Sequence, residues 1–407
     1  MKVLFIHTYY QLPGGEDTVL HNEMELLKSL GHTVELLAFD NKNNSILKLL
    51  LMLFNPFSYF KTKAKLKEFV PDVVHIHNLH FAASASVIYA VRNAKIPMVM
   101  TIHNYRLLCP SASLFHDGHL FLDSLDKGFP WSAVKKGVYQ NSKVITFWLA
   151  LSTYIHTKIK TYDLVDKFIF LNAHSRQLFL VSAFGIKEEK CMIKPNYLMD
   201  GGFSTNPKDH TYFLFIGRLT EEKGILTLLK AFENSNLWLK IAGIGPLQHL
   251  VEDYAQNNSN IEYLGQQTRE EIGNLLNEAE ALIFPSIWYE TFGMTIVEAF
   301  AKAVPVITSY LGNMKVIVSN QVNGLLFEPG NAVDLRNKVQ DFTATPPKIK
   351  KRFRQNARAS YENNYTSNLN SVRLMDIYSS CKPKQPMFTK PITTYEPSTQ
   401  IPIEQLN

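Results

Sequence analysis

The chain has 407 residues, of which 46% are hydrophobic and 19% are charged. These values exclude a disordered protein, and the length favours two domains of ordinary size over one compact core. The three cysteines lie far apart without the spacing of metal ligands, which argues against a disulfide framework and fits a reducing cytosol.

The net charge of +6 is confined to the first 200 residues, because the remainder contains equal numbers of acidic and basic side chains. A basic half attracts anionic partners such as nucleic acid, an acidic membrane surface or a phosphorylated acceptor. No nucleic-acid-binding module accompanies the charge, so we favour membrane and lipid phosphate. The start of the chain lacks a signal-peptide cleavage site, and no run reaches the ~18–20 apolar residues of a membrane span. We therefore expect a cytoplasmic protein, either free or peripheral on the inner face of the membrane.

The chain begins with a predicted βαβ unit. An apolar strand over residues 2–7 is followed by an amphipathic helix over residues 18–30 and by a second strand. Gly14 and Gly15 lie between strand and helix, where a glycine turn lets the backbone approach a ligand at the carboxyl end of the strand. The pair does not match the spaced glycines of dinucleotide-binding proteins, and a plain turn is the alternative interpretation.

An unusual stretch runs from Leu49 to Lys67. Leucine and aromatic side chains come first, and a cluster of lysines follows from residue 61. This combination suits an interfacial anchor, because the apolar groups reach acyl chains while the ammonium groups meet lipid phosphates. A buried helix followed by an exposed lysine face fits the pattern equally well.

Two further strands carry histidines. His75 and His77 share one face of a strand, and His103 follows the next strand along the chain. The carboxyl end of a strand is where open α/β sheets place ligands, although a structural role for His103 is the alternative. The histidine pair invites a metal interpretation, but no third ligand follows at a recognisable spacing, so no metal site is predicted.

The strand–glycine pattern restarts after a linker near residue 200. A new strand ends at Gly217, Arg218 follows it, and Lys223 precedes a helix. A planar guanidinium and an ammonium beside a helix N-terminus form a clamp for a diphosphate, with a solvated charged turn as the alternative. Two more strand–glycine units end at Gly245 and Gly265.

The most informative stretch covers residues 285–307. An apolar strand leads into a glycine turn at Gly293 and a helix from Met294. The first turn of that helix leaves amide N–H groups without internal partners, which favours a phosphate. Glu290 precedes the turn and Glu298 lies about two helical turns further along. Each carboxylate suits a pair of sugar or ribose hydroxyls; two solvated glutamates at an ordinary helix start are the alternative.

Two glutamates separated by seven residues, with Phe-Gly following the first, resemble the signature of the retaining family-4 glycosyltransferases of GT-B fold. The resemblance implies that Glu290 holds hydroxyls of the donor sugar and that Glu298 holds the nucleotide ribose. It also implies that His103 contacts the sugar and that Arg218 and Lys223 bind the diphosphate. The other donor-binding positions that it implies are Gly14, Gly15, Gly217, Gly245, Leu264, Gly265, Phe292, Gly293, Met294 and Thr295, with the base beside Leu264.

The predicted fold class is therefore α/β, with two doubly wound Rossmann-like domains facing a cleft. We expect an acceptor-side domain over residues 1–200 and a nucleotide-sugar-binding domain over residues 201–362. A helix over residues 363–380 is expected to cross back to the first domain, and residues 381–407 are expected to form a disordered tail.

The resemblance implies a retaining, metal-independent hexosyltransferase. It would move a sugar from a UDP- or GDP-sugar to a growing glycan or lipid-linked acceptor, without a cofactor. Residues 105–110 also resemble a subgroup that works on bacterial surface polysaccharides. One alternative is a nicotinamide-dependent oxidoreductase, which the missing glycine fingerprint disfavours. The other is a non-catalytic sugar-binding protein, which the intact set of charged site residues disfavours.

Overall fold

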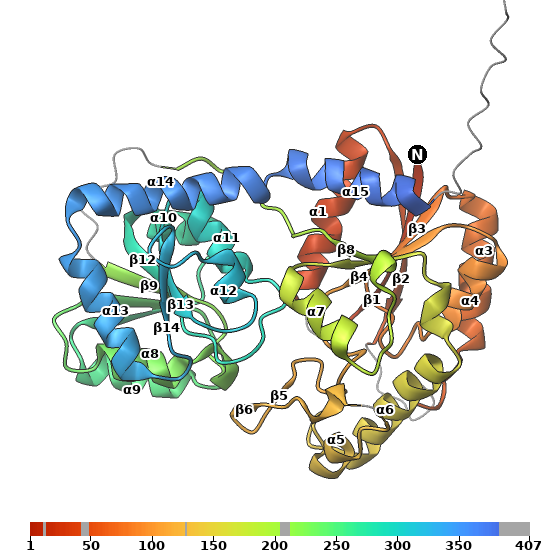
Figure 1. Ribbon diagram of the computed structural model, residues 1–407, viewed down its shortest axis with the longest axis horizontal. Coiled ribbons are helices and arrows are strands. Elements are labelled where there is room, and N and C mark those ends of the chain that lie inside the picture. The colour runs from red at the N-terminus through yellow and green to blue at the C-terminus, as the bar shows by residue number, and fades with distance from the viewer. Residues whose placement is uncertain (11–13, 42–48, 127, 204–211, 382–407) are drawn as a thin grey trace, which may run out of the picture.

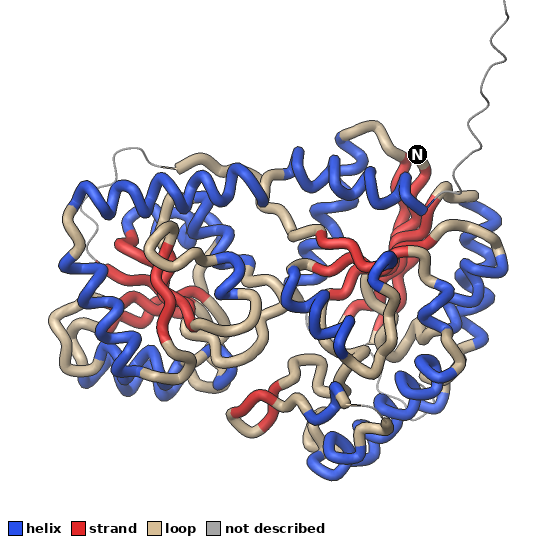
Figure 2. Tube along the Cα trace, in the orientation of Figure 1, coloured by secondary structure: helices blue, strands red, loops and turns tan. Residues whose placement is uncertain are grey.

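The computed structural model describes residues 1–10, 14–41, 49–126, 128–203 and 212–381. Within these ranges the chain forms two α/β halves joined along one side (Figure 1). Each half contains a six-stranded sheet in which all pairs of neighbouring strands are parallel, and helices cover both faces of each sheet (Figure 2). The predicted fold class of two Rossmann-like domains is confirmed.

The first sheet has the strand order β2-β1-β3-β4-β7-β8. Its central strands are buried on both faces, because their side chains are almost all apolar and helices pack above and below them. Its strands are β1 Lys2–Tyr9, β2 Thr33–Asp40, β3 Val73–Ile76, β4 Met98–Ile102, β7 Lys167–Phe170 and β8 Cys191–Ile193. The helices of this half are α1 Gly15–Ser29, α3 Pro56–Phe69, α4 Ser86–Asn93, α5 Trp131–Lys136, α6 Lys143–Lys158 and α7 Ala173–Val181, and a small hairpin is formed by β5 Phe115–His116 and β6 His119–Leu120.

The second sheet has the order β11-β10-β9-β12-β13-β14, and separate apolar clusters fill its two sides. Its strands are β9 Tyr212–Ile216, β10 Leu239–Ala242, β11 Ile261–Gly265, β12 Ala279–Phe284, β13 Val306–Ser309 and β14 Gly324–Phe327. The helices around it are α8 Ile225–Phe232, α9 Gln248–Asn257, α10 Arg269–Glu278, α11 Met294–Ala301, α12 Met314–Ile317, α13 Ala332–Ala344 and α14 Pro347–Asn364.

The last helix, α15 Ser367–Cys381, follows α14 and packs against the first half (Figure 1). Its Tyr378 hydroxyl lies 2.8 Å from Nδ1 of His75 on β3. The linker after β8 runs beside this helical crossing, because the amide of Leu198 donates to the carbonyl of Tyr365 at 3.0 Å. Both connections therefore lie on one side of the molecule. The tail expected to be disordered lies, from residue 382 onward, outside the described residues.

Helix α1 begins three residues earlier than the sequence pattern indicates. The Asp17 carboxylate accepts a hydrogen bond from the amide of Gly14 at 2.9 Å and also contacts Nε2 of His7 at 2.8 Å. A carboxylate in the first turn satisfies amides that the helix leaves free, so the helix can start at Gly15. The start of α1 is consequently fixed against the carboxyl end of β1.

Candidate active site

A cavity of about 320 Å³ lies between the two halves. The first half contributes residues from the start of α1, from the loop after β4 and from the end of the first sheet; the second half contributes the loops after β9 and β12. The predicted site residues that line it are Gly15, His103, Arg218, Lys223, Glu290, Phe292, Gly293, Met294 and Thr295. Those that do not line it are Gly14, Gly217, Gly245, Leu264, Gly265 and Glu298.

Lys223 and Glu290 form an ion pair inside this cavity. The Lys223 Nζ lies 2.6 Å from Oε1 of Glu290, and the Ser286 hydroxyl donates to the same oxygen at 2.7 Å. The Lys223 ammonium also lies 5.5 Å from the ring centroids of Phe284 and Trp288. The Arg218 side chain, by contrast, is 70% exposed. It pairs with Glu222 at 3.6 Å, and its exposure leaves room for a ligand to contact the guanidinium.

Two glycines make this arrangement possible. Gly224 adopts a φ of +71°, and a Cβ there would lie 2.0 Å from the carbonyl oxygen of Pro285. This close approach brings Lys223 beside the loop that carries Glu290. Gly293 adopts a φ of +94° as the N-cap of α11, which directs the free amides of Met294 and Thr295 at the cavity they line.

The loop that carries Glu290 is held against the first half of the molecule. Asn172 caps α7 through its side-chain oxygen, and its Nδ2 donates to the carbonyl of Thr291 at 2.5 Å. The ring of His174 in α7 stacks edge-on against Tyr289 with centroids 4.6 Å apart. These contacts cross from one half to the other, so they fix the position of Glu290 relative to His103.

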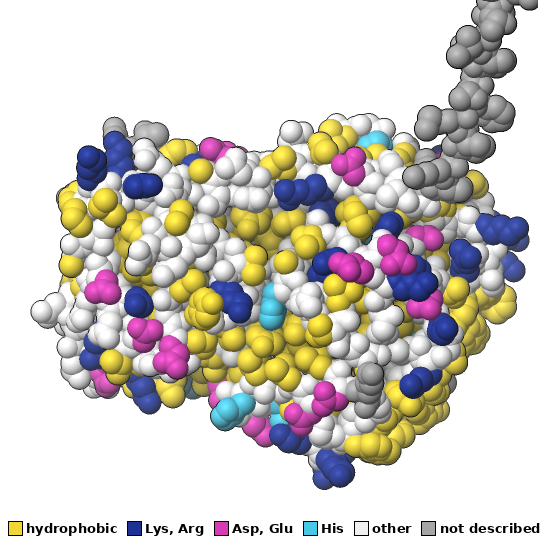
Figure 3. Space-filling model, in the orientation of Figure 1, with side chains coloured by type: hydrophobic (Ala, Val, Ile, Leu, Met, Phe, Trp, Pro, Cys, Tyr) yellow, Lys and Arg dark blue, Asp and Glu magenta, His cyan; other side chains and the backbone are white. Residues whose placement is uncertain are grey.

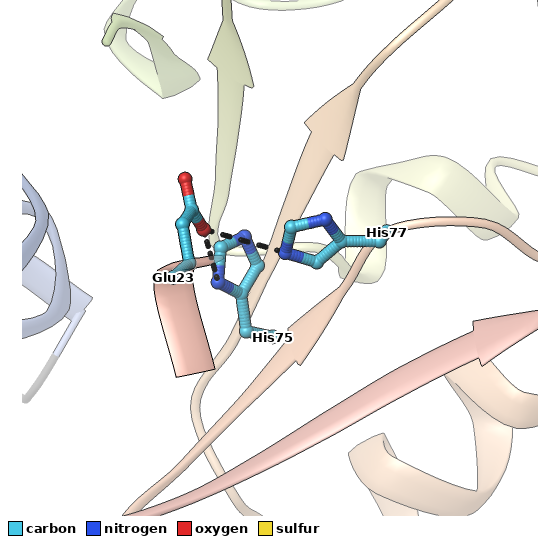
Figure 4. Close-up of side chains that lie close together, drawn as sticks. All are labelled: Glu23, His75 and His77. Atoms are coloured by element: carbon cyan, nitrogen blue, oxygen red, sulfur yellow. Dashed lines mark ion pairs between the residues drawn. The ribbon is translucent and has the colours of Figure 1, made fainter. Parts of the chain in front are cut away.

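His103 is connected to a buried charge network. Its Nε2 lies 2.9 Å from Nδ1 of His77, and Nε2 of His77 lies 3.5 Å from Oε2 of Glu23 (Figure 4). The Glu23 carboxylate in turn forms a buried ion pair with Lys194. Burial holds the pKa of His103 well below its usual value, so His103 is neutral near pH 7.

The tautomers of His77 and His103 are linked, because Nδ1 of His77 and Nε2 of His103 share one hydrogen bond. A proton on Nε2 of His77, toward the Glu23 carboxylate 3.5 Å away, would make Nδ1 of His77 the acceptor in that bond. Nε2 of His103 would then be the donor, and Nδ1 of His103 would be unprotonated.

Glu23, His75 and His77 are residue types that bind metals, and the structure brings a third group to the histidine pair that spacing alone did not reveal (Figure 4). However, the ammonium of Lys194 already neutralises the Glu23 carboxylate. His75 is also engaged on both sides, since its Nε2 lies 2.7 Å from the Thr101 hydroxyl and its Nδ1 contacts Tyr378. We interpret the group as a charge network that orients His103.

Glu298 lies on α11, about one turn beyond Met294 and Thr295 of the cavity, where its side chain is half-buried. Burial raises its pKa, and the charge of Arg269 at the start of α10 opposes this shift. The helix α10 follows β11, so Glu298 faces the same end of the second sheet as Leu264 and Gly265.

Several cavity residues were not predicted. They are Glu16, Val19, Leu171, Asn196, Phe284 and Thr291. Glu16 directly follows the glycine pair, and Asn196 follows Pro195 after the last strand of the first sheet, so position in the chain could have suggested both. Leu171 and Phe284 lie at the carboxyl ends of β7 and β12, where open α/β sheets place ligands, but as apolar residues they were interpreted as core of the sheet.

The stretch from Leu49 to Lys67 is buried on one face and exposed on another. One face of α3 is buried through Ser58, Thr62, Leu66 and Phe69, while Phe57 is 73% and Phe60 is 64% exposed. Figure 3 shows further hydrophobic side chains gathered over α5 and α6. None of the described helices is long and apolar enough to pass through a bilayer.

Two parallel-sheet domains that face each other across a ligand-sized cavity define the GT-B class of fold. Two family models divide the chain between them. The model "Glycosyltransferase Family 4" matches residues 13–196, and "Glycosyl transferases group 1" matches residues 202–360. The chain belongs to the GT-B glycosyltransferases of group 1 and family 4.

Relatives of the chain include bacterial sugar transferases. The O-antigen chain mannosyltransferase C of Escherichia coli is 28% identical over 42% of this chain and 46% of its own length. A D-rhamnosyltransferase of Pseudomonas aeruginosa is 30% identical over 38% of this chain and 42% of its own. An uncharacterized glycosyltransferase of Methanocaldococcus jannaschii is 34% identical over 33% of this chain and 38% of its own. The chain thus spans less than half of the length of these relatives.

Solved structures share the fold over most of the chain. HepE of Anabaena, determined in complex with UDP, covers 93% of this chain and 100% of its own, at 18% identity and a TM-score of 0.67. A glycosyltransferase of Rickettsia africae covers 93% of this chain and 98% of its own, at 18% identity and a TM-score of 0.69. The family matches give no support to the oxidoreductase alternative.

Proposed function

We propose that the protein transfers a sugar, with retention of anomeric configuration, from a nucleotide-diphosphate donor to a glycan or lipid-linked acceptor. The observation that carries this proposal is the convergence of His103, Arg218, Lys223, Glu290 and the amides at the start of α11 on one cavity. The sugar-transferring relatives, and the solved HepE complexes with UDP and UDP-glucose, support it.

The donor would lie along the face of the second domain. The diphosphate suits the amides of Met294 and Thr295 together with the exposed guanidinium of Arg218. Glu298 would hold the ribose, and the backbone at Leu264 and Gly265 would flank the base, with Gly217 and Gly245 as further donor-binding positions. Gly14 and Gly15 of the first domain would approach the sugar and its phosphate from the opposite side.

Donor binding would rearrange the Lys223–Glu290 pair. An arriving phosphate competes with Glu290 for the Lys223 ammonium, and the released carboxylate then accepts hydrogen bonds from sugar hydroxyls. The unprotonated Nδ1 of His103 accepts a hydrogen bond from one further hydroxyl of the sugar. Charge develops on the departing phosphate oxygen, and Arg218, Lys223 and the α11 amides stabilise it electrostatically. These contributions require no metal, and no protein nucleophile is assigned.

Association with an anionic membrane surface forms part of the proposed function. The exposed rings of Phe57 and Phe60 lie on α3 beside the exposed Lys63 and Lys67. Lys65 contributes less, because it is paired with Glu35 at 2.6 Å and with Glu68 at 2.9 Å. A protein placed in this way would work on lipid-linked intermediates of polysaccharide synthesis. Replacing Phe57 and Phe60 by Ser should abolish co-sedimentation with anionic vesicles; unchanged sedimentation would contradict the membrane role.

A donor screen tests the activity directly. Melting temperatures are measured with UDP, GDP and ADP and with their glucose or mannose derivatives, since a ligand that binds only the folded state raises the melting temperature. We expect one nucleotide to raise the melting temperature of the wild type, and its sugar derivative to raise it further. In Glu290→Gln the sugar derivative should raise the melting temperature no more than the nucleotide does. NMR of the product of transfer should show the donor's anomeric configuration, and EDTA should not alter the rate. An inverted product, or no response to any nucleotide, would overturn the proposal.

A further inference from the structure

Arg106 is a half-buried arginine that lacks an anionic partner. It follows β4 three residues after His103, and its guanidinium carbon lies 6.0 Å from the ring centroid of Tyr10 and 5.4 Å from that of Tyr139. Its Nη1 donates to the Pro110 carbonyl at a long 3.4 Å, while its Nε is buried and without a hydrogen-bond partner. No carboxylate of the described residues forms an ion pair with it. A guanidinium has five N–H donors, and at least the Nε donor of this one is left without a protein partner.

The local charge is also uncompensated. The acidic group that interacts with Arg106 is Glu16. Burial raises the pKa of Glu16 to about 8 against the opposing charge of Arg106, so Glu16 is mainly protonated near pH 7. Its Oε1 instead accepts a hydrogen bond from Asn78 at 2.9 Å. His80 is neutral too, because burial and Arg106 hold its pKa well below the usual value. Arg106 thus brings one positive charge that its surroundings do not cancel.

Arg106 lies where two cavities meet. One, of about 110 Å³, is lined by His103, Asn104 and His80; the other, of about 80 Å³, is lined by Cys109 and Pro110, and both border α6. Each has room for several water-sized groups. The larger cavity shares His103 with the cavity between the two halves, so the two cavities adjoin at His103; Arg106 lines the first of them and not the second.

We infer that Arg106 is the anion subsite of the acceptor and binds a singly charged oxyanion carried by the acceptor near the hydroxyl that receives the sugar. This inference rests on the proposed transferase function. One uncompensated guanidinium matches one negative charge, whereas a dianion would leave a second charge in a half-buried site. Two acceptor chemistries provide such a group: the carboxylate of an acidic sugar and the phosphodiester of a lipid- or polyol-linked glycan.

Two matched ligand pairs distinguish these sources. Methyl glucuronide is compared with methyl glucoside, and dimethyl phosphate with neutral trimethyl phosphate, by ligand-observed NMR titration at pH 7. We expect the charged member of one pair to bind the wild type about tenfold more tightly than its neutral counterpart. Arg106→Gln should remove that preference and Arg106→Lys should keep part of it. Arg92→Gln, which changes an exposed arginine on α4, should leave it intact.

Equal binding of charged and neutral members in both pairs by the wild type would overturn the inference, and so would a preference that persists in Arg106→Gln. The wild-type comparison decides the question even if Arg106→Gln fails to fold. Nucleotide binding is measured on the same samples. A protein that binds nucleotide without preferring anions contradicts only the anion subsite, whereas a protein that binds no nucleotide contradicts the proposed function.

Discussion

Replacing Lys223 by Met separates two roles assigned to Lys223: stabilising the folded protein through its ion pair with Glu290, and binding the diphosphate of the donor. The Glu290 side chain is only 7% exposed, so the variant leaves a carboxylate in the cavity with the Ser286 hydroxyl as its remaining partner. Removing one partner of a buried pair costs about 3–5 kcal/mol, and the 16% exposure of the Lys223 side chain reduces this to roughly 2–3 kcal/mol. For a domain of this size, the melting temperature should fall by about 4–12 °C.

The same substitution should weaken nucleotide binding. A lost charge-assisted hydrogen bond to phosphate corresponds to about 1.5–3 kcal/mol, or roughly a 10–150-fold higher Kd. The double variant Lys223→Met, Glu290→Gln removes the unpaired carboxylate, so it should recover most of the stability but none of the nucleotide affinity. Lys230→Met, at an exposed lysine on α8, is the matched control and should change neither quantity.

Thermal unfolding and isothermal titration with the nucleotide found in the donor screen measure both effects. A Lys223→Met protein with wild-type melting temperature would refute the assignment of a buried pair. A double variant that is as unstable as the single variant would show that the destabilisation does not arise from an unpaired carboxylate. Unchanged nucleotide affinity in both variants would remove Lys223 from the diphosphate site.

Three further outcomes follow from the geometry. Asn172→Ala should destabilise the protein by about 1–2 kcal/mol in urea unfolding, because α7 loses its cap and the Thr291 carbonyl loses its donor; no change would contradict the bridging role. Glu298→Gln should reduce the preference for a ribonucleotide over its 2′-deoxy analogue, and an undiminished preference would separate Glu298 from the ribose. The pKa of Glu16, about 8 when folded, exceeds its unfolded value, so folding binds extra protons and stability falls as pH rises from about 4.5 to 8. Glu16→Gln should flatten this decline in melting temperature, and parallel curves for the two proteins would exclude Glu16 as its source.

The sequence could predict which residues lie at strand–helix turns near the cavity, but it could not predict which of these residues contact each other. Lys223 and Glu290 were each placed at a strand–helix turn, because apolar runs, glycines and helix starts are local patterns. Their ion pair could not be foreseen, since it depends on the approach of Gly224 to Pro285, some sixty residues away. Contacts of this kind are set by how two strand–loop units pack in the folded domain.

The histidines show the same limit. The position of His103 at the carboxyl end of a strand marked it as a ligand candidate, but its support by His77 and Glu23 joins three separate elements. Spacing along the chain cannot reveal such a network, which is why a third partner for the histidine pair was missed. The sequence did not mark Arg106 as a candidate site residue, because a charged residue in a loop normally faces solvent. Only the packing of the folded protein shows that Arg106 is half-buried without a counter-ion.

A crystal structure with the stabilising nucleotide bound would test the central claim most directly. We predict the diphosphate at the amides of Met294 and Thr295, with Arg218 and Lys223 on its oxygens, Glu298 on the ribose and Glu290 released toward the sugar position. A nucleotide bound elsewhere, or bound here while Lys223 remains paired with Glu290 and Arg218 points into solvent, would contradict it.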